Sequence, residues 1–304
     1  MRTLVTGGAG FIGSTLVDRL LAEGHAVDVV DDLSGGRLDN LADARADRRN
    51  ELSIHHIDIR QPEVVDLLAR REPEVVFHLA DRAGVDPIVD AEVTILGTLR
   101  ILEGAHAAGA RKVVFASSAS VYGYVDDNRV PIRESQAQRP VSTHGVAKKA
   151  AADYLTAYRE MHGVEFTALA LGSVYGPRQF VGPVAAFASA LLAGRPATIF
   201  GDGLQTRDFL YVDDAVDALV RAAERGSGLL VNIGTGRETS VSHLFRTIAE
   251  QVGSPGVEPV SGPARAGDVR RSVLDAGRAK IHLGWSSWTV LEEGLADTLR
   301  AANR

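Results

Sequence analysis

The chain has 304 residues, enough to bury a full hydrophobic core, and 45% hydrophobic with 24% charged residues is ordinary for a globular protein. A formal net charge of −6 without a lysine-rich run gives no general attraction to nucleic acid or to an anionic membrane, so neither is expected as a partner. The absence of cysteine excludes disulfides, thiolate metal sites and a cysteine nucleophile.

The first strand is expected at residues 3–6, which leaves no room for a signal peptide before it. No apolar run approaches the roughly 20 residues that a membrane span needs. A cytoplasmic location is therefore the expectation.

A glycine-rich turn follows this strand. Within residues 3–14, Gly8, Gly10 and Gly13 fit G-x-G-x-x-G, and Gly7, Gly10 and Gly13 fit G-x-x-G-x-x-G. Because the turn lacks β-carbons, its backbone N–H groups and the N-terminus of the next helix can approach a pyrophosphate closely. The pattern predicts a dinucleotide site.

A helix at residues 15–23 and a strand at 26–30 follow, and the strand ends at Asp31. An acidic side chain at this place, about 20 residues past the glycines, can hydrogen-bond both ribose hydroxyls of NAD and repels a 2′-phosphate. Arg37 could instead pair with a 2′-phosphate, although a surface arginine is the simpler interpretation. NAD is therefore predicted rather than NADP.

Strands and helices alternate through the rest of the first half. Further strands are expected at 52–57, 75–79, 112–116 and 165–170, and helices at 64–70, 91–108 and 144–162. This alternation predicts an α/β fold with a doubly wound parallel sheet, the Rossmann arrangement, with right-handed crossovers.

Beyond residue 170 the chain changes to short pieces punctuated by glycine and proline. Helices are expected at 184–193, 241–252 and 290–301, and strands at 197–200 and 229–233. We therefore divide the chain into a Rossmann domain for NAD, residues 1–170 with 207–235 returning to it, and a smaller C-terminal substrate-binding lobe, residues 171–206 and 236–304.

Several sequence motifs follow one another along the chain. They are the glycine turn at 6–13, Asp31, D-I at 58–59, F-H-L-A at 77–80, S-S-A-S-V-Y-G at 117–123, V-Y-G-P-R at 174–178, T-R-D-F-L-Y-V-D at 206–213 and R-A-G-D at 265–268. Together they resemble the extended short-chain dehydrogenase/reductase family, and within it the nucleotide-sugar epimerases of the UDP-galactose 4-epimerase type. The resemblance covers nearly the whole chain.

The resemblance implies NAD as cofactor, a nucleotide sugar as substrate with a UDP-sugar favoured, and a homodimer. Family members pair through two helices, here 91–108 and 144–162, so Tyr154, Leu155 and Tyr158 belong either to that seam or to the core. No histidine spacing predicts a metal site.

The resemblance also assigns site residues. The implied cofactor-binding set is Gly7, Gly10, Phe11, Ile12, Gly13, Asp31, Asp58, Ile59, Leu79, Ala80, Ser117 and Lys148. The implied substrate-binding set is Ser118, Ser120, Ser173, Arg207, Arg265 and Asp268. Ser118 would bond the sugar hydroxyl that is oxidised, Lys148 would hold the nicotinamide ribose, and the last three residues would grip the nucleotide diphosphate and ribose.

The sequence departs from the family at the catalytic base. The family motif Y-x-x-x-K is here H-G-V-A-K, so the catalytic candidates are Ser118, His144 and Lys148, and the last two share a helix face. Imidazole has an ordinary pKa near 6.5, and its neutral form can accept a proton. The resulting imidazolium beside Lys148 and the oxidised cofactor is unfavourable, and imidazole reaches less far than a phenol. Two hypotheses stay open: His144 is a substitute base, or hydroxyl oxidation has been lost.

Further departures fall around the same expected cleft. Thr94 stands where the family commonly has asparagine, the loop at 81–87 is several residues short, and residues 170–173 read A-L-G-S in place of an aromatic and an amide. The cofactor side keeps its pattern while the substrate side changes. We infer an altered substrate or altered chemistry with NAD still bound.

The reaction class depends on the segment before V-Y-G. Family dehydratases and decarboxylases usually carry an acidic residue there, whereas this chain has Ala119 and Ser120. This favours a 4-epimerase that acts through a transient keto-sugar. The alternatives are a nucleotide-sugar dehydratase or other tailoring enzyme that uses His144 as acid or base, and a catalytically weak protein that binds NAD and a nucleotide sugar.

Overall fold

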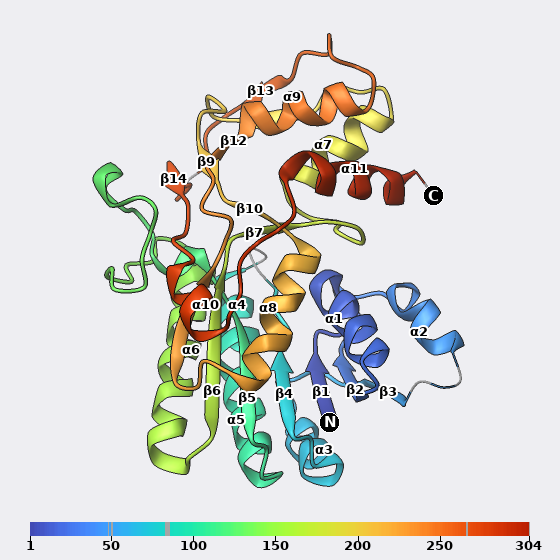
Figure 1. Ribbon diagram of the computed structural model, residues 1–304, viewed down its shortest axis with the longest axis vertical. Coiled ribbons are helices and arrows are strands. Elements are labelled where there is room, and N and C mark those ends of the chain that lie inside the picture. Colours follow the sequence, from blue (N-terminus) through green and yellow to red (C-terminus); the bar gives the residue numbers. More distant parts are fainter. Residues whose placement is uncertain (48, 50, 83–85, 266, 304) are drawn as a thin grey trace.

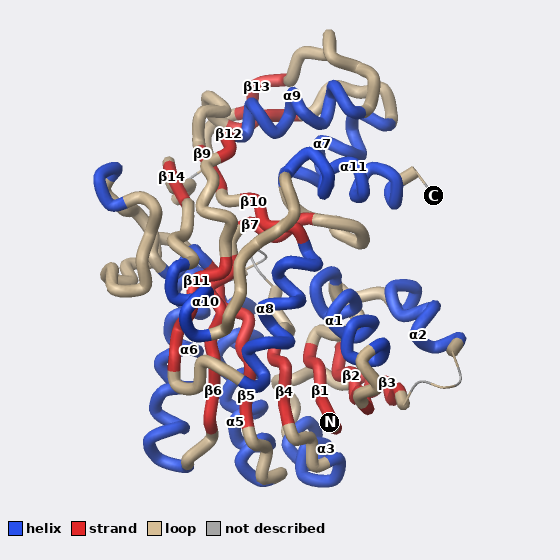
Figure 2. Tube along the Cα trace, viewed as in Figure 1, coloured by secondary structure: helices blue, strands red, loops and turns tan. Residues whose placement is uncertain are grey.

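A seven-stranded parallel sheet forms the centre of the computed structural model, which describes residues 1–47, 49, 51–82, 86–265 and 267–303 (Figures 1 and 2). From one edge to the other its strands are β3 (Leu52–His56), β2 (Ala26–Asp31), β1 (Arg2–Thr6), β4 (Val75–His78), β5 (Lys112–Ser118), β6 (Glu165–Leu171) and β11 (Leu229–Ile233). The chain leaves β1 toward β2 on one side and leaves β4 toward β5 on the other. The carboxyl ends of β1 and β4 therefore flank a switch point, where parallel sheets open a crevice.

Helices cover both faces of this sheet. One face carries α1 (Phe11–Ala22) and α8 (Val212–Glu224), and the other carries α3 (Glu63–Arg71), α5 (Gly97–Ala107) and α6 (Thr143–His162). Successive strand residues alternate between the faces: Val5 and Phe77 join the core under α1 and α8, whereas Leu4 and Val76 join the core under the other helices. The predicted doubly wound α/β fold is confirmed.

The helix predicted at 91–108 begins earlier and is interrupted. It starts as α4 (Pro87–Ala91), continues as a π-helical segment, η2 (Glu92–Leu96), and ends as α5. The Asp86 carboxylate accepts hydrogen bonds from the N–H groups of Ile88 and Val89, and Pro87 follows as the first helical residue. These residues start the helix ahead of the apolar periodicity on which the prediction rested.

The C-terminal lobe lies above the sheet in Figure 1. Its helices are α7 (Pro183–Leu192), α9 (Val241–Gln251) and α11 (Leu291–Ala302). Its strands pair with one another and with the segment 207–235: β7 (Ser173–Tyr175) with β10 (Phe209–Tyr211), β8 (Thr198–Phe200) with β13 (Val260–Gly262), and β9 (Thr206–Arg207) with both β12 (Thr239–Ser240) and β14 (Arg271–Ser272). Phe187 and Phe245 meet edge to face with ring centroids 5.5 Å apart, and both belong to the same core as Val5 of β1. The lobe and the sheet thus share one hydrophobic core.

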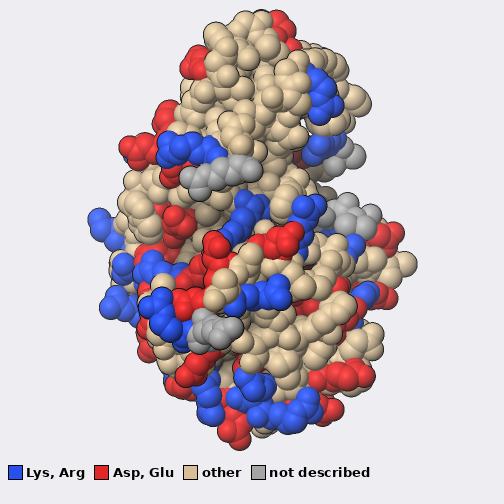
Figure 3. Space-filling model, turned by 90° about the vertical axis from the view of Figure 1, so that its right-hand side faces the viewer, with Lys and Arg blue, Asp and Glu red and all other residues tan. Residues whose placement is uncertain are grey.

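Short elements complete the surface: η1 (Leu38–Leu41), α2 (Ala42–Ala46), η3 (Ala119–Val121), η4 (Asp127–Arg129) and α10 (Gly277–His282). On the face drawn in Figure 3, basic and acidic side chains are interspersed rather than gathered into a field of one sign. Within the described ranges, no helix has the length and apolarity needed to cross a bilayer.

Candidate active site

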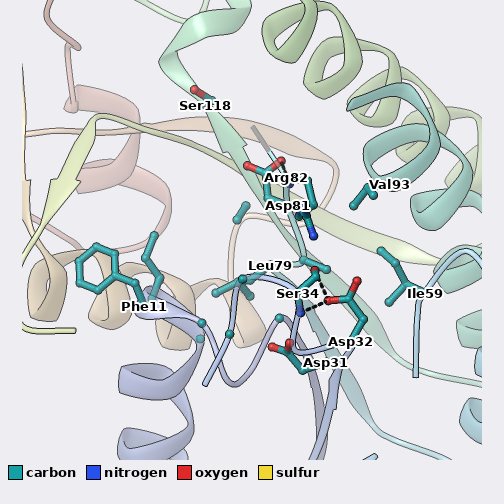
Figure 4. Close-up of a pocket in the computed structure, with 18 of the residues that line it drawn as sticks. Phe11, Asp31, Asp32, Ser34, Ile59, Leu79, Asp81, Arg82, Val93 and Ser118 are labelled. Atoms are coloured by element: carbon teal, nitrogen blue, oxygen red, sulfur yellow. Dashed lines mark hydrogen bonds between the residues drawn. The ribbon is translucent and has the colours of Figure 1, made fainter. Parts of the chain in front are cut away.

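A cavity of about 540 Å³ opens at the carboxyl ends of the central strands, where the switch point lies (Figure 4). Every residue of the predicted cofactor-binding set lines it, and so do Ser118 and His144. In Figure 4, Phe11 from α1, Asp31 at the end of β2, and Asp81 after β4 surround one space. The fold therefore brings residues from the glycine turn and residues as far along the chain as Lys148 to a single pocket.

The glycine turn forms the floor of this pocket. Gly7 has a φ of +68°, and a β-carbon there would lie 2.9 Å from backbone atoms of Ala80. A β-carbon on Gly13 would lie 2.0 Å from the carbonyl oxygen of Gly7. Glycine is required at both positions, because a side chain would separate the turn from the helix and from the end of β4.

Asp31 lies next to the glycine turn and is hydrogen-bonded to it. Its carboxylate accepts hydrogen bonds from the N–H groups of Ala9 (2.9 Å) and Leu33 (2.9 Å). Burial raises the pKa of Asp31, and the two N–H bonds oppose that rise. Since each carboxylate oxygen has a second lone pair, the side chain can still accept the hydroxyl groups of a ribose.

Ser117 offers an unused polar group to the same cavity. Its side chain is buried, 3% exposed, and its hydroxyl has no hydrogen-bond partner among the described residues. A buried hydroxyl without a partner costs stability unless a ligand satisfies it. The glycine cradle, Asp31 and Ser117 together fit the phosphates and polar groups of a dinucleotide.

A charged cluster stands at the other wall of the pocket. Oδ2 of Asp81 lies 3.0 Å from Nε2 of His144 and 3.5 Å from Nζ of Lys148. Lys148 is only 3% exposed at its side chain, donates to the carbonyl oxygen of Ala116 at 2.9 Å, and lies over the ring of Phe115. Because His144 and Lys148 are four residues apart on a helix, their side chains lie on the same face, and both contact the Asp81 carboxylate.

Asp81 is ionised in this setting. Burial alone would raise its pKa, but the Lys148 ammonium and the hydrogen bond from His144 hold the pKa of Asp81 well below its usual range. Thr94, from the π-helical segment, donates to the other carboxylate oxygen at 3.5 Å. The predicted departures at Thr94, at the loop after residue 80 and at His144 therefore meet at one carboxylate; residues 83–85 of that loop lie outside the described residues.

Two serines complete this wall. Ser118 ends β5, lines the cavity, and accepts a hydrogen bond from the N–H of Ser120 at 3.1 Å. The hydroxyl of Ser120 lies 3.4 Å from Nδ1 of His144. Both ring nitrogens of His144 thus face a polar side chain.

A buried network behind the wall joins it to the glycine turn. His78 lies between the hydroxyl groups of Thr6 (2.7 Å from Nδ1) and Thr98 (2.9 Å from Nε2). Thr98 donates its own hydrogen to the carbonyl of Thr94, so it accepts from Nε2 of His78, and Nδ1 accepts from Thr6. Burial, with help from Lys148, lowers the pKa of His78 to about 3. His78 is a neutral structural link between the two walls.

Comparison with known proteins identifies the family. The model of the NAD-dependent epimerase/dehydratase family matches residues 3–234. The chain belongs to this family. A UDP-glucose 4-epimerase of Mycolicibacterium smegmatis is 48% identical, over 98% of this chain and 97% of the relative. The predicted family and the prediction of NAD as cofactor are confirmed.

Solved structures of UDP-glucose 4-epimerases agree with the fold. A UDP-glucose 4-epimerase of Thermotoga maritima, solved with UDP-glucose, superposes with a TM-score of 0.94 at 40% identity and covers 100% of this chain and 99% of its own. A UDP-glucose 4-epimerase of Thermus thermophilus in complex with NAD has a TM-score of 0.90 at 35% identity, with coverage of 100% and 99%.

The remaining predicted substrate residues of this epimerase/dehydratase chain, Ser173, Arg207, Arg265 and Asp268, are not among the residues that line the cavity. The Arg207 guanidinium pairs with the Asp268 carboxylate and donates to the carbonyls of Thr206 and Val269. The guanidinium of Arg265 stacks 4.1 Å above the centre of the Phe200 ring. Ser173 is bound into β7 through its N–H, which donates to the carbonyl of Asp208, and it does not line the cavity.

Asp81 is the residue that the sequence analysis missed as a functional side chain. The one available signal was its place directly after a buried parallel strand, where polar side chains reach the crevice. The motif to its N-terminal side drew attention to the cofactor, and nothing local connects residue 81 with residue 144.

Proposed function

We propose that this chain is an NAD-dependent nucleotide-sugar 4-epimerase, with a UDP-sugar as the favoured substrate and with His144 accepting the proton of the sugar hydroxyl. The observation that carries the proposal is the continuity of one pocket from the glycine turn to Ser118, His144 and Lys148. A dinucleotide held by the turn would extend toward Asp81, His144 and Lys148, whose side chains can hold or transfer a proton.

The division of labour follows from this pocket. Residues 1–170 with 207–235 hold NAD, through Gly7, Gly13 and Asp31 above all, and residues 171–206 and 236–304 hold the nucleotide sugar. NAD, when bound, supplies the acceptor and donor of the hydride at the sugar carbon. Ser118 orients the sugar hydroxyl and Lys148 the ribose, while His144 takes and returns the hydroxyl proton.

His144 as a working base is supported by its surroundings. The sequence alone raised the objection that an imidazolium beside Lys148 is unfavourable. The Asp81 carboxylate lies between the two groups and supplies a compensating negative charge. Of the two hypotheses for His144, these contacts favour the substitute base.

A nucleotide diphosphate would be held where the C-terminal lobe meets the segment 207–235. Arg207 and Arg265 supply guanidinium groups for phosphate oxygens, and Asp268 is placed to accept a ribose hydroxyl. In the structure Arg207 and Asp268 pair with each other, so a bound nucleotide would exchange this pair for bonds of its own. Ser120 and Ser173 are the remaining substrate candidates.

An incubation with NAD and a panel of UDP-, dTDP- and GDP-sugars tests the function. We expect interconversion of one sugar with its 4-epimer by NMR, without net change of the near-ultraviolet absorbance of reduced cofactor. His144→Gln should lower the rate by at least about 100-fold because a general base is lost. His243→Gln, which changes an exposed histidine on α9, should leave the rate unchanged.

Other products would contradict the proposal. A dehydrated sugar would indicate the tailoring-enzyme alternative, in which His144 serves a different carbon. Binding of NAD and a nucleotide sugar without any product would indicate the catalytically weak binding protein.

We also propose a homodimer that pairs α4–α5 and α6 with their equivalents. Ile88 (69% exposed), Val146 (52%) and Tyr154 (42%) present apolar surface on these helices, whereas Leu155 is buried in the core. Exposed apolar side chains on these two helices are consistent with the proposed contact surface. Sedimentation of the wild type as a dimer and of Val146→Glu as a monomer is expected; a monomeric wild type would contradict the pairing.

The proposal includes a cytoplasmic location, where the chain would acquire NAD as a bound cofactor. Fractionation of cells with an antibody against the chain tests it.

A further inference from the structure

Ser120, His144 and Asp81 form a line of contacts across the pocket wall. Nε2 of His144 lies 3.0 Å from Oδ2 of Asp81, and Nδ1 lies 3.4 Å from Oγ of Ser120. A carboxylate can only accept, so Nε2 carries the hydrogen in this contact and Nδ1 is the unprotonated nitrogen. The lone pair available for a proton therefore points at the Ser120 hydroxyl.

Asp81 is held for this task by contacts other than His144. Nζ of Lys148 lies 3.5 Å from the same oxygen, and the hydroxyl of Thr94 donates to the other oxygen. The pKa of Asp81 is held well below its usual range by Lys148 and His144, which outweigh its burial. The carboxylate stays ionised at neutral pH, and the contact with Nε2 is a charge-assisted one.

Ser120 lies beside the ring of His144, with Oγ 3.4 Å from Nδ1. Its N–H is bonded to Oγ of Ser118, the residue that ends β5 and lines the cavity. Ser120 thus lies between the cavity-lining serine and the ring of His144. A contact of 3.4 Å is long for a hydrogen bond, and contacts of this kind tighten when substrate is bound.

We propose that Asp81 positions His144 as the Nε2–H tautomer and that Ser120 relays the sugar hydroxyl proton to Nδ1. The inference rests on the proposed function. When the sugar is oxidised, its O–H bond breaks and the proton passes to Ser120 Oγ, while the Ser120 hydroxyl proton forms a bond to Nδ1. The electron pair of the O–H bond becomes the second bond of the new carbonyl. The C–H bond of the same carbon breaks, and its hydrogen leaves with both electrons as a hydride that NAD would accept when bound. In the return step the hydride would reach the opposite face of the keto-sugar, and the protons go back along the same path.

The relay separates the roles of its members. Ser120 and His144 move protons, whereas Asp81 is a positioning residue that fixes the tautomer and offsets the charge of the imidazolium. Lys148 alone would repel that imidazolium, and Asp81 lies in contact with both groups. The order serine, histidine, aspartate is also that of the contacts in serine hydrolases, but there serine contacts Nε2 and aspartate contacts Nδ1, so the two ring nitrogens are exchanged here, and no covalent bond to serine is formed.

The first test reads the tautomer directly. Two-bond proton–nitrogen NMR spectra of the NAD-loaded protein labelled with ¹⁵N-histidine, with the His144→Gln spectrum to assign the signals, report which nitrogen carries hydrogen. We expect a protonated Nε2 and an unprotonated Nδ1 at neutral pH. Asp81→Asn should abolish this preference, because an amide can donate as well as accept. Asp153→Asn, which removes an exposed carboxylate from the helix that carries His144, should leave the preference for the Nε2–H tautomer unchanged.

The second test divides kcat from KM. Asp81→Asn should lower kcat by about 100-fold, and Ser120→Ala by about tenfold, with KM for the sugar within about twofold in both variants. Ser120→Thr should restore most of the rate because it returns the hydroxyl. NAD binding by calorimetry and an unchanged melting temperature confirm that each variant is folded.

The outcomes distinguish the two claims. A wild type that epimerises a sugar but carries the hydrogen on Nδ1, or a Ser120→Ala variant with the full rate, overturns the relay and leaves the proposed function standing. A wild type with the expected tautomer that epimerises no sugar overturns the proposed function, and the relay with it; the positioning of His144 by Asp81 is then judged from the spectra alone.

Discussion

The two walls of the pocket are built in different ways. The wall around the glycine turn is made of backbone: Gly7 and Gly13 admit close contacts, and backbone N–H groups bind the Asp31 carboxylate. The wall around Asp81 is made of side chains, where one carboxylate contacts His144 and Lys148. Backbone geometry tolerates almost no change of residue, whereas a group of charges can be rebuilt with other residues as long as the charges balance.

This difference is consistent with the places where the sequence analysis predicts a departure from the family. The glycine turn keeps the family pattern because any β-carbon at its closest contacts meets backbone atoms. At the other wall the resemblance drawn from the sequence puts His144 where the family motif has tyrosine, and in the structure Asp81 is in contact with His144. The predicted exchange would thus be matched by a compensating charge from a different strand end, as expected when electrostatics rather than sterics holds a site together.

The largest expected effect is on NAD affinity and comes from a substitution in the glycine turn. Gly13→Ala should weaken NAD binding by at least 100-fold, about 2.7 kcal/mol, because its β-carbon would lie 2.0 Å from the carbonyl oxygen of Gly7 and force the turn apart. Calorimetric titration with NAD measures the affinity. Gly256→Ala is the matched control, since nothing lies within 4 Å of a β-carbon there. Equal affinities in the two variants would show that the turn does not form the cofactor cradle.

The second prediction removes the link between the walls. His78→Ala should lower the free energy of unfolding by about 3 kcal/mol, because it leaves a cavity and deprives the hydroxyls of Thr6 and Thr98 of a buried partner. Denaturant titration at pH 7 measures it. His282→Ala, at an exposed histidine, should change stability by less than about 0.5 kcal/mol.

The same variant tests the pH dependence. The folded pKa of His78 is about 3, below the unfolded value of 6.5, so the folded state binds fewer protons between these values. Its contribution to stability is complete above pH 6.5 and is lost as the pH falls toward 3. The difference in stability between wild type and His78→Ala should therefore shrink from pH 7 to pH 4; a constant difference would mean that the pKa of His78 is not lowered in the folded protein.

The smallest expected effect separates ligand binding from folding. Ser117→Ala should weaken NAD binding about fivefold, by ~1 kcal/mol, because one hydrogen bond to the cofactor is lost. Without NAD the variant should be as stable as the wild type or slightly more stable, since the buried hydroxyl has no partner among the described residues. Melting curves with and without NAD measure both. Lower stability with unchanged affinity would assign Ser117 to the fold instead.

The extent of sequence-based prediction differed between elements for local reasons. The helix at 144–162 was predicted within one residue of α6, because its periodicity is regular and Gly163 ends it with a φ of +71°. The helix at 91–108 was predicted without its first turn and without its π-helical segment, since capping by Asp86 and an inserted residue leave no apolar repeat to detect. Every residue of the predicted cofactor set was placed at the cavity, whereas Ser173 lies away from its lining.

The sequence by itself determined the fold class, the family and the dinucleotide turn. Each is indicated by short motifs of neighbouring residues, whose spacing along the chain fixes the local backbone geometry. It also placed His144 and Lys148 on one helix face. The tertiary structure alone decided what lies opposite them. Asp81 and His144 are 63 positions apart, and they meet only because the sheet sets the end of β4 beside β5 and the start of α6 packs over it. Charge balance between such residues is a property of strand order, which no local pattern contains.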